Sequence, residues 1–237
     1  YVVSHPADPN IFYAGATNAL TRYDRGTGIV RDIQPYPRIV MGEPARDMPE
    51  RWNWTYPIAV SFAEPDALYV GSQHLWKSSD EGTSWQRISP DLTRADPETM
   101  NDSGGPVVKD QDGPEIYATL YSITPSPHDA ATIWTGSDDG FVHITRDSGE
   151  NWSNVTPPDM IAHTRVMTID VSHHDAGTAY VAGIRYEMDD RSPYAWKTND
   201  YGENWTKIID GIAPDDFVRV VREDPDRSGL LYAGTEH

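Results

Sequence analysis

The sequence contains no cysteine, which excludes both a disulfide scaffold and a thiolate metal site. No apolar run approaches the roughly 18 residues that a transmembrane helix requires. Positive charge is scarce, because 19 Lys and Arg stand against 37 Asp and Glu and give a formal net charge of −18. Nucleic acids and anionic membranes bind cationic surfaces, so neither is expected as a partner.

Helical periodicity is missing as well. No segment keeps apolar residues at i, i+3, i+4 and i+7 over three turns. The composition instead suits short strands joined by turns, with 13 Tyr and 8 Trp beside 18 Gly and 19 Pro. A chain of 237 residues can bury a full core, as one all-β domain or as two small ones.

One eight-residue pattern, [Ser/Thr]-x-Asp-x-Gly-x-x-Trp, occurs three times, at 78–85, 145–152 and 198–205. The Asp is expected to close an Asx-type turn, and the Gly to supply the positive φ of a hairpin. The Trp is expected to bury its ring against a neighbouring unit. We therefore assign a structural role to Asp80, Gly82, Trp85, Asp147, Gly149, Trp152, Asp200, Gly202 and Trp205. A degenerate copy keeps Asp24 and Gly26 but has Ile29 in place of Trp.

Each copy of the pattern closes a longer repeat of four short strands with alternating apolar residues. The repeats predict one β-propeller segment with antiparallel four-stranded blades at 1–33, 57–89, 116–156 and 165–209, and half a blade at 217–237. Two inserts, 34–56 and 91–115, separate the first three blades. Since Tyr1 is not an initiator Met and no signal peptide is visible, we expect an excerpt of a larger propeller.

The repeats resemble those of the sialidase, sortilin and xyloglucanase-like propellers, in which the pattern is the Asp-box of the BNR repeat. Further stretches resemble large exported bacterial proteins labelled glycosyl hydrolase or sortilin-like, namely 52–57, 103–106, 136–140, 217–225 and 231–236. The resemblance implies a secreted or periplasmic protein that binds a glycan or a protein. It also implies that the rest of the same protein, or another chain, completes the propeller.

Ligand binding is expected on one face of the propeller. The loop before a blade's first strand and the loop between its second and third strands emerge together, whereas the repeat hairpin points to the opposite face. The candidate ligand-binding residues on this loop face are Asn53, Trp54, Tyr56, His74, Tyr117, Arg165, Arg185, Tyr186, Arg219 and Glu236. Arginine forks onto carboxylates and aromatic faces stack on sugar rings, which suits a glycan or a carboxylate ligand. Alternatively, Arg165 and Arg219 pair with carboxylates around the channel.

Asp138 and Asp139 are the candidate catalytic residues, because paired carboxylates can separate their pKa values for acid and base roles. The alternative is a turn, since Asp-Asp-Gly is itself hairpin chemistry. Sialidase chemistry would use an arginine triad, for which Arg165, Arg185 and Arg219 are available, but no Tyr/Glu nucleophile pair is identifiable. The sequence predicts no cofactor and no metal.

Three functions remain open. The first is a binding module for a glycan or protein ligand. The second is a glycoside hydrolase whose acidic residues lie partly outside this excerpt. The third is a sortilin-like peptide binder, in which an extended segment adds to an exposed blade edge.

Overall fold

The computed structural model describes residues 1–16, 19–37, 42–103 and 116–237. The chain is all-β, as the repeats predict. The first sheet contains β1 (Val2–Ser4), β2 (Ile11–Ala16), β3 (Ala19–Asp24) and β4 (Ile29–Asp32). The second contains β5 (Ile58–Val60), β6 (Leu68–Gly71), β7 (Leu75–Ser78) and β8 (Gln86–Arg87).

Two further four-stranded sheets and a pair of strands complete the described chain. The third sheet contains β9 (Leu120–Pro125), β10 (Ile133–Ser137), β11 (Val142–Thr145) and β12 (Ser153–Asn154). The fourth contains β13 (Arg165–Val171), β14 (Ala179–Arg185), β15 (Asp190–Thr198) and β16 (Thr206–Lys207). The last pair is β17 (Val218–Glu223) and β18 (Leu231–Thr235). All strand pairs are antiparallel.

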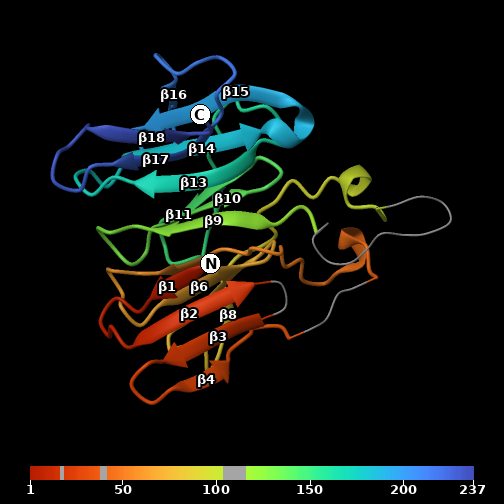
Figure 1. Ribbon diagram of the computed structural model, residues 1–237, viewed down its shortest axis with the longest axis vertical. Helices are drawn as coiled ribbons and strands as arrows, with labels where there is room; N and C mark the ends of the chain where they lie inside the picture. Colours follow the sequence, from red (N-terminus) through yellow and green to blue (C-terminus); the bar gives the residue numbers. More distant parts are fainter. Residues whose placement is uncertain (17–18, 38–41, 104–115) are drawn as a thin grey trace.

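In Figure 1 the first and second sheets overlap in the lower part of the view, the third sheet lies above them, and the fourth sheet overlaps with β17 and β18 in the upper part. The first strand of each sheet contacts the first strand of the next, as β5 does with β9 and β9 with β13. These first strands therefore lie next to one another, along one edge of the row of sheets. We call the row of sheets the arc, and this edge its inner edge. A hydrophobic cluster fills each space between consecutive sheets, with Tyr13, Tyr69, Trp134 and Trp196 among its fully buried side chains.

The two inserts carry short 3-10 helices, η1 (Ala45–Asp47) and η2 (Pro97–Thr99), and η3 (Tyr186–Met188) joins β14 to β15. Figure 1 shows η1, η2 and η3 on one side of the sheets, while the turns that join β3 to β4 and β17 to β18 lie on the other. We call these sides the loop face and the hairpin face. Parts of both inserts, residues 38–41 and 104–115, lie outside the described residues.

The three repeat hairpins are held by the same hydrogen bonds, shown here for the third sheet. The Asp147 carboxylate accepts from Thr145 Oγ1 at 2.8 Å and from the Asn151 backbone N–H at 2.9 Å. Gly149, at φ 96°, donates its N–H to Thr145 Oγ1 at 2.9 Å. The Asn151 side-chain amide donates to the other carboxylate oxygen at 2.8 Å, and this bond, together with the two just named, holds the pKa of Asp147 below its ordinary value. Asp80 and Asp200 are bound in the same way.

Each repeat hairpin also closes the contact with the preceding sheet, which we call a seam. The indole N–H of Trp152 donates to the backbone carbonyl of Ile88 at 3.0 Å. A Cβ on Gly149 would lie 2.5 Å from the same carbonyl oxygen, so only glycine fits there. The other two seams repeat this arrangement, with Gly82 and Trp85 on Ile33 and with Gly202 and Trp205 on Val155. In each seam the glycine and the tryptophan of one hairpin thus contact the same residue of the preceding sheet.

Candidate functional site

Arg165 and Arg219 lie at the loop-face ends of β13 and β17, on the inner edge of the arc. The Arg165 guanidinium lies 5.0 Å from the centre of the Tyr121 ring, and its NH1 atom lies 2.6 Å from Glu187 Oε1. The Arg219 guanidinium stands 4.9 Å from the Phe217 ring and 5.6 Å from the Tyr186 ring. Both arrangements combine an ion pair with stacking on an aromatic face.

These groups belong to one site. Tyr186 and Phe217 stack at 5.2 Å between ring centres, and Arg219 is paired with Glu236 at 2.6 Å. Burial and the neighbouring Glu187 raise the pKa of the Tyr186 hydroxyl, whereas Arg165 and Arg219 both act against that rise. We call Tyr121, Arg165, Tyr186, Phe217 and Arg219, with the glutamates 187 and 236, the arginine–tyrosine cluster. It joins four of the predicted binding residues: Arg165, Tyr186, Arg219 and Glu236.

Arg185 has partners of its own. Its Nε donates to Asp190 at 3.1 Å, and an NH1 hydrogen bond goes to the carbonyl of Ala162. Tyr194 donates its hydroxyl proton to the same Asp190 carboxylate at 2.7 Å. Although burial opposes it, these bonds lower the pKa of Asp190 to about 2. All three arginines therefore have a carboxylate partner from within the chain.

Asp138 and Asp139 form the turn between β10 and β11, and both are 1% exposed. Asp138 accepts from the Thr119 N–H and from Thr119 Oγ1, each at 2.8 Å. Burial, with a contribution from the charge of Asp139, raises the pKa of Asp138 to about 7. Its two oxygens are thus both engaged with Thr119, the residue that leads into β9.

Asp139 fastens the second insert to the sheet. Its carboxylate accepts from the backbone N–H groups of Arg94 and Ala95 at 2.8 and 3.1 Å, and from Ser137 Oγ at 2.6 Å. Burial raises the pKa of Asp139 despite these bonds. The Arg94 guanidinium in turn lies 4.1 Å from the Phe141 ring and donates to the Asp139 carbonyl. The turn therefore acts as an anchor for the loop in front of it.

The remaining predicted binding residues lie over the second and third sheets. Asn53 is buried and points its amide at Ile116 and Thr119, each at 3.4 Å. Tyr117 contacts His163 Nδ1 through its hydroxyl at 3.0 Å, and burial raises the pKa of that hydroxyl. Tyr56 is buried and donates to the Ala19 carbonyl at 2.7 Å. Trp54, in contrast, is 47% exposed.

His74 forms a pair that the sequence did not reveal. Its Nδ1 lies 3.1 Å from both carboxylate oxygens of Glu50, a buried residue of the first insert. Ser72 donates to the same carboxylate at 2.5 Å. Burial opposes ionisation of Glu50, but the bonds from His74 and Ser72 hold its pKa below the ordinary value. Nothing in the local sequence around Glu50 signals this contact, because its partners come from the β6–β7 loop.

Arg51 is a second anchor that repeat analysis missed. Its Nε donates to the Ala118 carbonyl at 2.8 Å, and its NH2 group contacts Asp91 at 2.7 Å and Thr93 at 3.0 Å. These bonds join the first insert to the start of the second insert and to the segment that leads into β9. Within the described residues, no group of three or more His, Asp and Glu side chains converges as a metal site requires.

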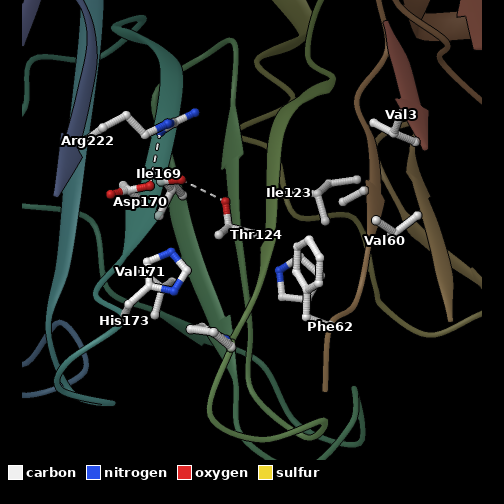
Figure 2. A pocket seen from close by; sticks show the side chains of 13 residues that line it. Val3, Val60, Phe62, Ile123, Thr124, Ile169, Asp170, Val171, His173 and Arg222 are labelled. Carbon is white, nitrogen blue, oxygen red and sulfur yellow. Dashed lines mark hydrogen bonds and ion pairs between the residues drawn. The ribbon is translucent and has the colours of Figure 1, made fainter. Parts of the chain in front are cut away.

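A hollow of about 390 Å³ lies on the inner edge, at the ends of β5, β9 and β13 that face away from the loop face. Figure 2 shows Val3, Val60 and Phe62 on one side of it and Asp170, His173 and Arg222 on the other. Arg222 pairs with Asp170 at 3.3 Å. None of the predicted site residues borders this hollow.

Comparison with known proteins identifies related folds. No family model matches the sequence, and no curated protein matches it. Among solved structures, a GH74 xyloglucanase from Xanthomonas campestris is 20% identical, with a TM-score of 0.63 over 99% of this chain and 34% of that chain. A GH74 enzyme from Niastella koreensis is 16% identical, with a TM-score of 0.63 over 98% of this chain and 33% of that chain.

A nutrient-binding protein is similar as well. An auxiliary nutrient binding protein from Bacteroides thetaiotaomicron is 11% identical, with a TM-score of 0.51 over 87% of this chain and 40% of that chain. At these identities the likeness shows the fold alone: a β-propeller architecture shared with GH74 enzymes. The chain spans about a third of the two GH74 structures it matches. In the described residues no helix is both long and apolar enough to cross a membrane.

Proposed function

We propose that this chain is a glycan-binding segment of an exported β-propeller, and that the ligand lies over the arginine–tyrosine cluster of the loop face. The observation that carries the proposal is the pairing of each arginine with both an aromatic ring and a glutamate. Stacked rings and fixed N–H donors, side by side, are what a pyranose ring and its hydroxyls need.

The charge of the cluster favours a neutral ligand. Glu187 and Glu236 neutralise Arg165 and Arg219, so the cluster carries little net positive charge. The whole chain is strongly acidic and repels anions at long range. A neutral polysaccharide therefore fits better than an acidic sugar or an acidic peptide. The fold shared with a GH74 xyloglucanase and with a nutrient binding protein supports the same ligand class.

Binding can be measured by affinity electrophoresis and calorimetry with soluble neutral polysaccharides, xyloglucan first. We expect Tyr186→Ala and Arg219→Ala each to weaken binding about tenfold or more, because each removes a stacking or hydrogen-bonding surface. The matched control is Arg227→Ala, an exposed arginine in the turn between β17 and β18, on the hairpin face. The proposal would be contradicted if the wild type and the three variants bound equally well. It would also be contradicted if the wild type bound none of the polysaccharides.

Glycoside hydrolysis is the second candidate, and the raised pKa of Asp138 is what favours it. A carboxyl with a pKa of about 7 is partly protonated at neutral pH and can act as a general acid. Against this role, both oxygens of Asp138 are bound by Thr119 and the side chain is almost fully buried. Release of new reducing ends from xyloglucan, lost in Asp138→Asn, would support the enzyme. Binding without such release supports the module.

A further inference from the structure

The hollow on the inner edge has two unlike walls, which face each other in Figure 2. The apolar wall contains Val60 and Phe62, and the polar wall contains Asp170, His173 and Arg222. Phe62 is 73% exposed, more than any other large apolar side chain in the described part of the chain. Most of the lining comes from β5, β9 and β13 and the turns that follow them. The hollow is therefore a feature of three complete sheets in the middle of the chain.

Arg222 is held less closely than the arginines of the loop face. Its NH1 atom lies 3.3 Å from Asp170 Oδ1 and donates to the Val221 carbonyl at 3.2 Å. The ion pairs of Arg165 and Arg219 are shorter, at 2.6 Å each. Within the described residues the Nε and NH2 groups of Arg222 make no hydrogen bond, and its side chain is 50% exposed. The guanidinium therefore keeps N–H donors for a ligand in the hollow.

Asp170 and His173 complete the polar wall. Asp170 Oδ2 accepts the backbone N–H of Glu223 at 2.8 Å, and Oδ1 pairs with Arg222. Asp170 thus orients the guanidinium without using all of its donors. The ring of His173 makes no hydrogen bond within the part of the chain that the structure describes, and even a neutral imidazole can donate one N–H. The polar wall therefore offers donors from two side chains, while both oxygens of its carboxylate already have partners.

We infer that the hollow binds a small amphipathic carboxylic acid, with its carboxylate on Arg222 and its apolar body against Val60 and Phe62. Arginine can bind a carboxylate through two parallel N–H bonds, which the unbonded Nε and NH2 groups allow. The volume of about 390 Å³ lies in the range of small-molecule sites. The acidic surface of the chain opposes an anion, but salt at about 0.15 M screens charges more than about 8 Å away. The groups that line the hollow therefore decide which ligand it takes.

Calorimetric titration of the full chain with octanoate, in about 0.15 M salt, tests the inference. Octanamide is the ligand control, because it has the same length and no charge. We expect octanoate to bind about tenfold more tightly than octanamide, and Arg222→Gln to abolish this preference. We expect Phe62→Ala to weaken the binding of both ligands about threefold or more, since it removes apolar surface from the hollow.

Arg227→Gln and Ile161→Ala are the matched control variants, because both residues are exposed and lie outside the hollow. Both should bind octanoate like the wild type. Arg222 and Phe62 are also largely exposed, so all four variants should fold, and their melting temperatures check this.

The inference would be overturned if the wild type bound no octanoate, if octanamide bound equally well, or if Arg222→Gln kept the preference for octanoate. The inference does not rest on the proposed function, because the hollow contains no residue of the arginine–tyrosine cluster. Polysaccharide binding should be unchanged in Arg222→Gln, so the two proposals can fail separately.

Discussion

The hairpin face and the loop face of this molecule are built in opposite ways. On the hairpin face the same turn recurs three times with nearly the same bonds: Asp80, Asp147 and Asp200 each bind the residue four positions later. Among the described residues of the loop face, the contacts differ from sheet to sheet. One carries a Glu50–His74 pair, another the buried Asp138 and Asp139, and the last two the arginine–tyrosine cluster.

Ionisable groups on the two faces differ in the same sense. The aspartates of the hairpins are stabilised as anions by local donors, and their pKa values lie below the ordinary value. Burial raises the pKa values of Asp138 and Asp139, so their ionised forms destabilise the fold. The repeated hairpins therefore hold neighbouring sheets together, whereas the contacts of the loop face differ from one sheet to the next.

The largest expected effect is at a seam. Gly149→Ala places a Cβ 2.5 Å from the Ile88 carbonyl oxygen at φ 96°, so the two sheets must separate locally. We expect a loss of about 2–4 kcal/mol in the free energy of unfolding, measured in urea. Gly28→Ala is the matched control, since φ there is 74° but nothing lies within 4 Å, and only the conformational cost of about 1 kcal/mol applies. Equal losses would mean that the close contact is unimportant.

The next effect concerns Asp138 and has a defined pH dependence. The pKa of the Asp138 carboxyl is raised to about 7 in the folded state. The protonated carboxyl therefore contributes fully to the stability of the fold below about pH 4, and this contribution is lost as the pH rises through 7. Asparagine resembles that form and stays neutral. We expect the free energy of unfolding of Asp138→Asn to exceed that of the wild type by about 1–3 kcal/mol at pH 7.5. Near pH 3.5 the two proteins should differ little.

The matched variant on the hairpin face should behave in the opposite sense. The pKa of Asp147 is lowered by its bonds to Asn151 and Thr145, so its contribution is present above the unfolded pKa and lost as pH falls. Asp147→Asn should therefore destabilise the chain at pH 7.5 and have less effect in acid. Urea titrations at the two pH values check both variants, and effects of the same sign would contradict the distinction between the faces.

A smaller effect is expected from the indole hydrogen bond alone. Trp152→Phe keeps an aromatic ring in the seam but removes the donor to the Ile88 carbonyl, which should cost about 1 kcal/mol plus some packing. Trp54→Phe on the loop face is the comparison, because Trp54 is 47% exposed and should cost close to nothing. Thermal and urea unfolding of the two variants measure the difference, and similar losses would argue against the seam bond.

The smallest effect is at the arginine–tyrosine cluster. The ion pair of Arg219 with Glu236 is partly exposed, so Arg219→Ala should change the free energy of unfolding by less than about 0.5 kcal/mol. The same variant is expected to weaken polysaccharide binding. A loss of stability as large as that of Gly149→Ala would mean that the cluster supports the fold instead of a ligand.

The sequence predicts the sheets well because the repeat hairpin is a local structure. Asp147, Gly149 and Trp152 lie within six residues, and the turn chemistry of the first two can be deduced without knowing the rest of the fold. The role of Trp152 at a neighbouring unit follows from its size and polar N–H. The particular acceptor, the carbonyl of Ile88, is 64 residues away and could not be deduced.

The loop face was less predictable because its contacts join distant segments. Arg94 and Asp139, 45 residues apart, meet because the second insert folds back over the β10–β11 turn. Glu50 reaches His74 from an insert that has no repeat to align it. The Asp-Asp-Gly pattern did indicate a turn, and Asp138–Asp139 forms one, but its burial beneath the insert depends on the tertiary structure.

The seams have a direction, which bears on how the chain assembles during synthesis. Each one is closed by a glycine and a tryptophan that emerge later, acting on a carbonyl that emerged earlier. A nascent chain can therefore form its sheets one at a time, and the hairpin of each new sheet stabilises the sheet before it. This assembly does not depend on segments that are distant in the sequence. The same polarity means that each sheet lacks this contact until the hairpin of the next sheet has been synthesised.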